Sequence, residues 1–178
     1  VGYSANSNGT NYTNSTGIGY DADCTASNQV RIGNTTVSSI GGYASWSNVS
    51  DGRFKTNVNE DVKGLAFINK LKPVTYNLDL DAIAKYYNTP DSMRLKDSEA
   101  LKSQIIQSGF IAQDVEQAAR EVGYSFSGVD APKNNEDAYG LRYAEFVVPL
   151  VKAVQEQQEM IEAQQKQIDQ LLELLNKK

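Results

Sequence analysis

The sequence contains no histidine and a single cysteine, Cys24, in 178 residues. Catalysis by a histidine base is therefore excluded, and so are the usual zinc sites, which are built from histidine and cysteine ligands. One cysteine cannot form a disulfide within the chain, so Cys24 is expected to be a small packing residue. No group of residues indicates a metal or any other cofactor.

Positive charge is scarce as well. The formal net charge is -5, and lysine and arginine do not cluster anywhere in the sequence. A nucleic-acid-binding surface needs such a cluster, so nucleic acid is not an expected partner. No apolar run is long enough to span a bilayer, and the amino end has neither a charged leader nor an apolar run. We expect no membrane insertion, and we expect the chain to be the tail of a longer protein.

Carboxylates are rare at the amino end. The first 50 residues contain only Asp21 and Asp23, which disfavours a glycan hydrolase in this region. More than half of residues 1–42 are serine, threonine, asparagine or glycine. A composition of this kind is compatible with disorder.

A repeat within this polar region favours order. Val1-Gly2-Tyr3, Ile18-Gly19-Tyr20 and Ile32-Gly33-Asn34 recur at spacings of 17 and 14 residues. A β-branched residue followed by glycine suits short strands that turn through glycine in a stacked β-roll. Such thin coils bury little on their own, so three chains side by side would supply the missing core.

Residues 43–49 contain the bulky side chains between this repeat and residue 50, namely Tyr43, Trp46 and Val49. One interpretation is that Tyr43 and Trp46 seal the end of the β-stack against the next domain. The other is that they order the approach to the following segment and exclude water from Lys55. The two interpretations are compatible.

The composition changes abruptly at Ser50-Asp51-Gly52-Arg53-Phe54-Lys55, beyond which the chain is charged and helix-prone. The change predicts two domains, residues 1–49 and 50–178. The same stretch places a hydroxyl and an amine five residues apart around a turn-forming Asp-Gly. That is the minimum for a Ser/Lys dyad, in which a buried, neutral amine accepts the serine proton. An ordinary exposed turn would give the same pattern.

Four sequence blocks occur in order: Ser50-Asp51-Gly52-Arg53-Phe54-Lys55, Leu71-Lys72-Pro73-Val74-Thr75-Tyr76, Gly109-Phe110-Ile111-Ala112-Gln113-Asp114-Val115-Glu116 and Tyr143-Ala144-Glu145-Phe146-Val147-Val148-Pro149-Leu150. Together they resemble the peptidase S74 or intramolecular chaperone domain. This domain is found at the C-terminus of phage endosialidases, tail spikes and tail fibres and, as an autocleavage domain, in myelin regulatory factor. The resemblance covers residues 50–178. The first 49 residues are similar, more loosely, to trimeric adhesin heads and tail-fibre shafts.

The resemblance implies a fold and a reaction. The fold is mixed α and β: an N-terminal trimeric β-roll or β-helix-like repeat, then an α+β chaperone domain that ends in a long coiled-coil helix at about residues 144–176. The reaction is a single self-cleavage by a serine protease mechanism, in which Ser50 attacks the carbonyl of Val49 and Lys55 is the general base. Asp51 and Gly52 are the candidates for support, and no metal takes part.

The resemblance also implies a biological setting. We expect a homotrimer whose chaperone domain folds the fibre or spike domain of the same chain and is then released. The expected place is the tail fibre or spike of a phage or prophage virion, assembled in the bacterial cytoplasm, in preference to a cell-surface adhesin. Upstream regions would contact a host glycan or receptor. The alternative is a permanent trimerisation and receptor-binding cap that does not cleave.

Local patterns predict the elements of the second domain. Asn57 and Glu60 form a capping-box pattern before an apolar repeat at Val62, Leu65, Ile68 and Leu71 that ends at Pro73. Residues 79–107 are helix-compatible, and are read either as a protruding arm or as a surface hairpin. The remaining predictions are a strand at 74–78, a strand at 109–112, a helix capped by Asp114 and ending near Val122, a loop at 124–138 and a strand at 139–143.

The final helix has the strongest periodicity in the sequence. Apolar and glutamine residues follow a heptad seam, with Val147, Val154, Ile161, Ile168 and Leu175 at a, and Leu150, Gln157, Gln164 and Leu171 at d. Glutamine layers in such a seam specify register and oligomer number at a cost in stability. The seam alone allows a dimer or a trimer. Pro149 falls in the first turns, where the regular helix is expected to begin or bend.

Overall fold

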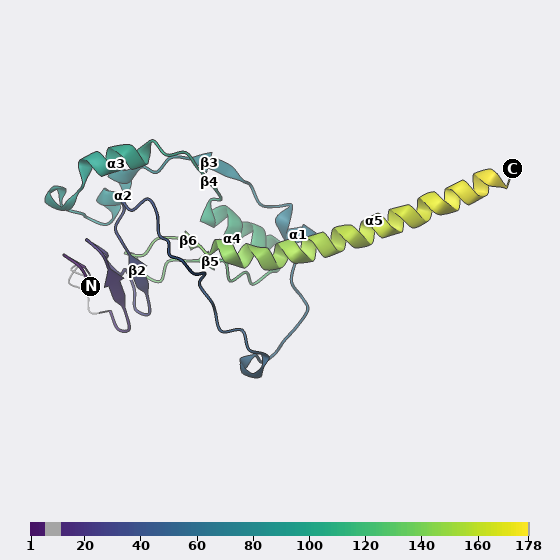
Figure 1. Cartoon of the computed structure of the whole chain (residues 1–178), viewed down its shortest axis with the longest axis horizontal. Helices are drawn as coiled ribbons and strands as arrows, with labels where there is room; N and C mark the ends of the chain where they lie inside the picture. The colour runs from purple at the N-terminus through teal and green to yellow at the C-terminus, as the bar shows by residue number, and fades with distance from the viewer. Residues whose placement is uncertain (6–11, 178) are drawn as a thin grey trace. The chain divides into compact units, whose positions relative to one another are not determined.

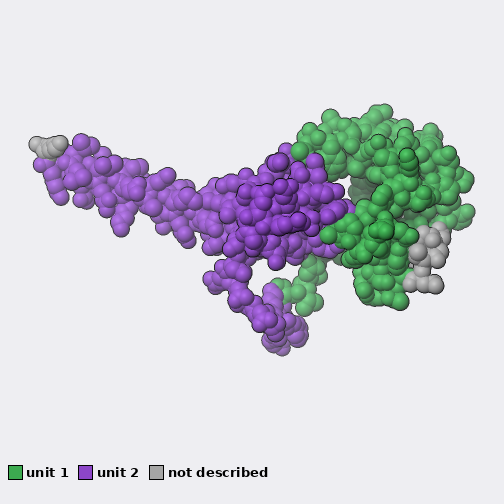
Figure 2. Space-filling view, turned by 180° about the vertical axis from the view of Figure 1, so that it is seen from behind, with its two compact units in different colours: residues 1–50, 74–109, 131–138 green, residues 51–73, 110–130, 139–178 purple. Residues whose placement is uncertain are grey.

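The computed structural model describes residues 1–5 and 12–177. The chain forms two compact units, each built from three segments (Figure 2). Unit 1 comprises residues 1–50, 74–109 and 131–138, and unit 2 comprises residues 51–73, 110–130 and 139–178. The mixed α and β class with a long C-terminal helix is confirmed (Figure 1). The predicted domain boundary at residue 50 stays a prediction.

The amino-terminal part of unit 1 contains two short parallel strands, β1 (Thr16–Ile18) and β2 (Val30–Ile32). Thr16 pairs with Val30, so the register is an offset of 14 residues, the spacing of the sequence repeat. The first repeat lies beside the second, because the Gly19 N–H donates to the Val1 carbonyl at 2.9 Å. Each regular strand is only three residues long, so a complete β-roll remains a proposal.

Close contact between the repeats explains their glycines. Gly2 and Gly19 have φ angles of +145° and +112°, which side-chain-bearing residues rarely adopt. A Cβ atom on Gly2 would lie 2.3 Å from the Gly19 carbonyl oxygen, and one on Gly19 would lie 3.3 Å from the Gly33 Cα. The adjacent rings of Tyr3 and Tyr20 stack at 5.6 Å between centroids. Gly2 and Gly19 therefore allow neighbouring backbones to approach.

Residues 74–109 of unit 1 form a helical insertion between two paired strands. Strands β3 (Val74–Tyr76) and β4 (Gln107–Gly109) are antiparallel. Between them lie α2 (Leu80–Tyr86), the 3₁₀ turn η2 (Asp91–Met93) and α3 (Lys96–Ser103). The predicted strand at 74–78 is confirmed for its first three residues, and the helix-compatible stretch at 79–107 forms two helices.

Arg94 fastens this insertion. Its guanidinium donates to both carboxylate oxygens of Glu99 and, at 2.6 Å, to Asp81. The Arg94 and Glu99 side chains are only 10% and 8% exposed. A forked guanidinium satisfies two carboxylates at once, so one residue holds α2 and α3 together.

Unit 2 has the apolar core. Five side chains form its centre, and aromatic rings from the following loop close around them: Phe67, Val115, Ala118, Ala119 and Phe146, with Tyr124 and Phe126. Helix α4 (Ala112–Glu121) supplies the alanines on one face. The short strands β5 (Val129–Asp130) and β6 (Gly140–Leu141) are antiparallel. Strand β5 lies within the predicted loop at 124–138, and β6 forms part of the predicted strand at 139–143.

The predicted helix after Asn57 is wrong in extent. Only α1 (Leu65–Ile68) is helical. Asn57 has a left-handed φ of +53° and does not cap the helix. The Glu156 carboxylate instead accepts the Leu65 N–H at 2.7 Å, so the cap comes from a distant helix. A Cβ on Gly64 would meet the Ala153 backbone nitrogen at 2.7 Å, which explains glycine at this contact.

The predicted cap of α4 is also corrected. The helix begins at Ala112, after Ile111, and Asp114 lies within its first turn. A carboxylate there favours the positive end of the helix dipole without forming a side-chain cap.

The final helix agrees with its prediction. The 3₁₀ turn η3 (Tyr143–Phe146) leads directly into α5 (Val147–Asn176), a helix of 30 residues. Pro149 is fully buried at the third helical position, where it interrupts no backbone hydrogen bond of the helix.

Candidate functional site

The predicted cleavage segment runs across the boundary between the units. Ser50 is the last residue of its segment in unit 1, and Asp51 is the first residue of unit 2. Asp51 caps the 3₁₀ turn η1 (Gly52–Phe54) by accepting the Arg53 N–H at 2.9 Å. The Lys55 N–H donates to the Gly52 carbonyl at 3.2 Å. Asp51, Gly52 and Lys55 are thus brought together in one tight turn.

Arg53 forms an ion pair with Asp51 within this turn. Its guanidinium binds both Asp51 oxygens, with the shortest distance 2.7 Å. This hydrogen bonding lowers the pKa of the Asp51 carboxyl and raises the pKa of Arg53. Asp51 is therefore engaged in shaping the turn. The N–H groups of residues 53–55 all donate within it, and Asp51 and Gly52 stay the predicted candidates for support.

The cleavage segment is open to solvent in the single chain. Val49 is 86% exposed, and Ser50 and Lys55 are exposed as well. A lysine acts as a base only when neutral, and burial is what favours the neutral form. The single chain does not bury Lys55, so the dyad that pairs Ser50 with Lys55 stays a prediction.

Tyr43 and Trp46 do not seal the end of the β-stack within the single chain. Trp46 is 88% exposed, and Tyr43 is fully exposed. No residue between Ile40 and Val49 forms a helix or strand. The two predicted functions of these aromatic residues both concern the assembled protein, so both stay predictions.

A buried polar cluster in unit 1 joins residues 25–31, which include the start of β2, to residues 131–138. Its centre is the Asp137 carboxylate, which is 3% exposed and accepts the Thr25 hydroxyl at 2.6 Å and the Lys133 N–H at 3.2 Å. Gln29 and Arg31 each approach it at 3.5 Å. We call these residues with Asn134 the coil clasp. Because a buried carboxylate is costly unless hydrogen-bonded, the clasp depends on a correctly formed coil.

The electrostatics of the clasp follow from these contacts. Burial raises the pKa of Asp137, but hydrogen bonds from Thr25, Lys133 and Gln29 and the charge of Arg31 outweigh it. The carboxyl pKa therefore lies below its usual range, and Asp137 is ionised at neutral pH. Asn134 completes the clasp by donating to the Thr25 carbonyl at 2.8 Å.

A second contact holds the chain that follows β2. The Lys102 ammonium of α3 donates to the carbonyls of Thr35 and Val37, both at 2.6 Å. Burial lowers the pKa of Lys102. Within unit 1, the helical insertion and the 131–138 loop thus both hydrogen-bond to the amino-terminal region.

The surface of α5 carries the heptad seam in exposed form. The a and d positions from Val154 onward are all exposed, and Ile161, Ile168 and Leu175 are at least half exposed. An exposed apolar stripe of this length is typical of a coiled-coil helix, and the coiled coil stays a prediction.

Sequence reasoning missed the residues that make the clasp and the α1 cap. Asp137 and Asn134 lie in a polar loop, and Glu156 lies on a helix surface, so nothing local distinguishes them. Their partners are more than 90 residues away. Only the tertiary structure reveals these contacts.

In residues 1–5 and 12–177, no three histidine, cysteine, aspartate or glutamate side chains are grouped to hold a metal ion. In the same residues, no helix combines the length and the apolar character that crossing a membrane requires.

Comparison with known proteins gives one match. Residues 50–124, about two-fifths of the chain, match the family model Peptidase_S74, described as chaperone of endosialidase. The match begins at Ser50 and includes three of the four sequence blocks, while the block at 143–150 and α5 lie outside it. It confirms the predicted resemblance for this segment. No curated protein and no solved structure matches the chain.

Proposed function

We propose, from the premise that residues 50–124 belong to the chaperone-of-endosialidase family, that this chain ends a trimeric fibre or spike whose folding it assists. In this proposal residues 50–178 are the intramolecular chaperone and residues 1–49 are the end of the β-repeat that it folds. After assembly the chaperone cuts itself off at the Val49-Ser50 bond.

One observation carries the proposal, namely that the family match begins at Ser50. The candidate nucleophile is thus the first residue of the matched segment. A cut on its amino side would separate the β-repeat from the whole of the chaperone and leave no part of the chaperone behind.

The proposed reaction needs no external substrate. Lys55 Nζ, neutral when buried, takes the proton of the Ser50 hydroxyl as Oγ attacks the Val49 carbonyl carbon. The Val49-Ser50 C–N bond then breaks, the Ser50 nitrogen receives the proton, and the Val49 acyl group remains as an ester on Oγ. Water hydrolyses the ester, which yields the Val49 carboxylate and restores the hydroxyl. The N–H groups of Asp51 and Gly52 would stabilise the oxyanion.

Trimerisation is supported by the exposed surfaces. The heptad seam of α5 is exposed, and its Gln157 and Gln164 layers can hydrogen-bond to their copies around a symmetric axis. Ile18 and Ile32 of the parallel strands are also exposed, at 42% and 38%. Three copies would cover both sets of side chains, and would supply the core that a thin β-roll lacks.

The coil clasp gives the chaperone activity a physical basis. Asp137 and Asn134 find their partners only when residues 25–31 have taken their folded positions. The chaperone would therefore stabilise the correctly formed coil over other conformations of this polar sequence. Release makes folding irreversible in practice, which leaves a kinetically stable shaft. The setting we propose is a phage or prophage tail fibre or spike, with receptor contacts made by upstream regions.

Denaturing electrophoresis tests the self-cleavage. We expect the wild-type chain to appear as two fragments, and Ser50→Ala and Lys55→Gln to appear as one intact chain. Ser47→Ala, three residues upstream, is the matched control and is expected to cleave like the wild type. Mass spectrometry of the fragments should place the cut between Val49 and Ser50.

The exposure of Lys55 favours a second candidate, a trimerisation and receptor-binding cap that does not cleave. An intact wild-type chain that is trimeric by native mass spectrometry would support the cap and refute the protease.

A further inference from the structure

The connection between the last coil and α1 exposes large side chains in a regular pattern. From Ser38 to Asp61 every residue except Asp51 is exposed, and η1 is the only helix or strand assigned there. Its first half contains four large apolar or aromatic residues, each 61% exposed or more: Ile40, Tyr43, Trp46 and Val49. Single exposed apolar residues are ordinary, but four in a regular series mark an interaction surface.

These four residues recur every third position, with glycine, alanine, serine and asparagine between them. A strand repeats every two residues and an α-helix every 3.6, so neither places the four on one face. A polyproline-II-like chain has three residues per turn and does. The small residues on the other positions, including Gly41 and Gly42, let neighbouring chains approach closely.

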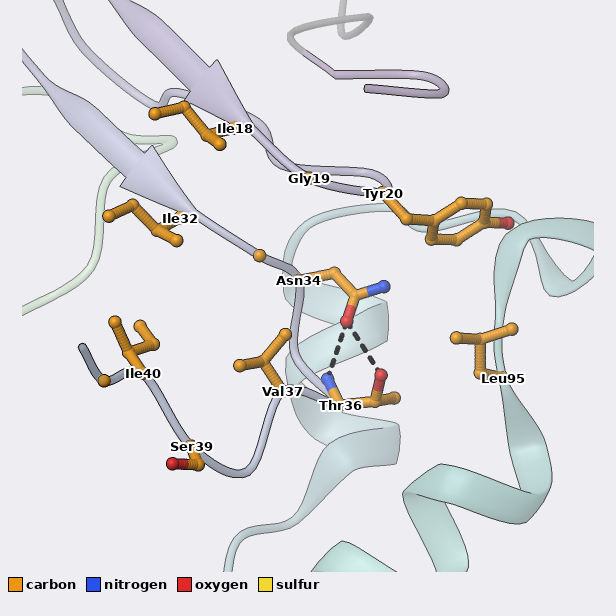
Figure 3. A pocket seen from close by; sticks show the side chains of 12 residues that line it. Ile18, Gly19, Tyr20, Ile32, Asn34, Thr36, Val37, Ser39, Ile40 and Leu95 are labelled. Carbon is orange, nitrogen blue, oxygen red and sulfur yellow. Dashed lines mark hydrogen bonds between the residues drawn. The ribbon is translucent and has the colours of Figure 1, made fainter. Parts of the chain in front are cut away.

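The pattern continues an apolar surface of unit 1. Ile40 lines an open groove of about 500 Å³ together with Ile18, Ile32, Val37 and Leu95 (Figure 3). Ile18 and Ile32 are the paired ends of β1 and β2. The series at Ile40 therefore extends the exposed isoleucine face of the coils.

The absence of charge favours copies of this chain as the partner of this surface. Residues 32–50 contain no charged side chain, so identical segments do not repel one another and a charged partner finds no complement. Each copy also presents the same apolar series, which makes the surface self-complementary around a symmetry axis.

We infer that residues 40–49 of three copies wind around a common axis with Ile40, Tyr43, Trp46 and Val49 facing inward. This inference rests on the proposed function and names the surface that activates it. Counting on in threes from Val49 reaches Gly52 and Lys55, and the 3₁₀ turn between them also has three residues per turn. In this winding the side chains of Val49, beside the scissile bond, and of Lys55 share the three-residue phase that assembly buries.

Disulfide cross-linking tests the phase. The background for the test is Cys24→Ala with Ser50→Ala, which removes the native thiol and keeps the chain intact. Single cysteines are then introduced: Val49→Cys at an inward-facing position, and Ser47→Cys and Asn48→Cys at positions that do not face inward. Three thiols at one axis can form one pair, so after mild oxidation Val49→Cys should give cross-linked dimers in up to about two-thirds of the chains. The two out-of-phase variants should give at least fivefold fewer.

Trp46 is the only tryptophan, so its fluorescence reports on the same surface without any substitution. We expect acrylamide to quench Trp46 in the assembled, intact Ser50→Ala protein severalfold less than in the urea-unfolded chain. Quenching equal to that of the unfolded chain would overturn the inference.

Native mass spectrometry of the same samples separates the failures. A trimer with equal cross-linking at residues 47, 48 and 49, or with none at 49, overturns the winding and leaves the proposed function standing. A subunit count other than three refutes the trimer of the proposed function, and the winding with it.

Discussion

Replacing Asp137 by asparagine tests the coil clasp. Asparagine has nearly the same shape as aspartate, so it introduces no cavity, but it removes the charge and turns one oxygen into an N–H donor. The retained oxygen can still accept the Thr25 hydroxyl. The new amide nitrogen would face the Lys133 N–H, which now donates to Asp137 at 3.2 Å.

The magnitude follows from these contacts. The 2.6 Å distance from Thr25 to Asp137 is typical of a charge-assisted bond, and losing the charge costs about 1 kcal/mol. A donor left without an acceptor at Lys133 costs about 1–2 kcal/mol more. Arg31 is 43% exposed and 3.5 Å away, so its ion pair contributes little. The clasp should weaken by about 2–3 kcal/mol, which is roughly 30- to 150-fold in its opening equilibrium.

Amide hydrogen exchange measures this opening directly. The Thr25 and Ala26 N–H groups donate to the Gln29 side chain within the clasp, so their exchange should accelerate by the same factor. Asp91→Asn is the matched control, because Asp91 lies in the same unit and is 87% exposed. Exchange within twofold of the wild type in Asp137→Asn would refute the argument that the clasp holds the coil.

Further predictions concern pH, the cap, the coils and the seam. The pKa of Asp137 is lowered in the folded chain, so the ionised carboxylate stabilises the clasp above the unfolded pKa of about 3.9. This stabilisation is lost as pH falls through the lower folded pKa. The amide exchange of Thr25 and Ala26 should therefore accelerate below about pH 4 more in the wild type than in Asp137→Asn. Glu156→Ala removes the α1 cap and should lower the unfolding free energy of unit 2 by about 1 kcal/mol in a urea titration, whereas Glu159→Ala on the exposed side of α5 should not. Gly19→Ala forces a side chain into φ +112° and should lower the unfolding free energy of unit 1 by about 1–3 kcal/mol in a urea titration. No comparable loss is expected in unit 2 for Gly140→Ala, where the added methyl has an ordinary 3.6 Å contact. Isoleucine at both 157 and 164 should raise the melting temperature of the assembly and broaden its subunit count by native mass spectrometry, and an unchanged single count would contradict the assigned function of the glutamine layers.

Local sequence patterns predicted the elements whose signals are local. The heptad seam found α5 because one face of a helix repeats over many turns, and the 14-residue repeat matched the register of β1 and β2. The helix predicted after Asn57 was too long because the spacing of its apolar residues alone was taken to define the extent of the helix. The helix begins only at Leu65, where the Glu156 carboxylate, 91 residues away, satisfies the first N–H.

The candidate site divides in the same way. Ser50 was predicted because it lies at a compositional border and in a recognisable block. The family match begins there, and its function as nucleophile stays a prediction. Asp137 could not be found, because its partners at residues 25–31 are brought to it only by the fold. Polar loop residues become informative when burial shows which of them have been removed from water.

The contact between Glu156 and α1 has a consequence for the direction in which the exposed residues of α5 point. Beyond this anchor α5 continues for 20 residues, about 30 Å, as exposed helix. Because the helix is rigid, its rotation about its own axis is the same along its length. The contact of Glu156 with α1 therefore fixes the direction in which Ile161, Ile168 and Leu175 point. One residue inserted after Glu156 would swing that direction by about 100°, whereas seven would nearly restore it.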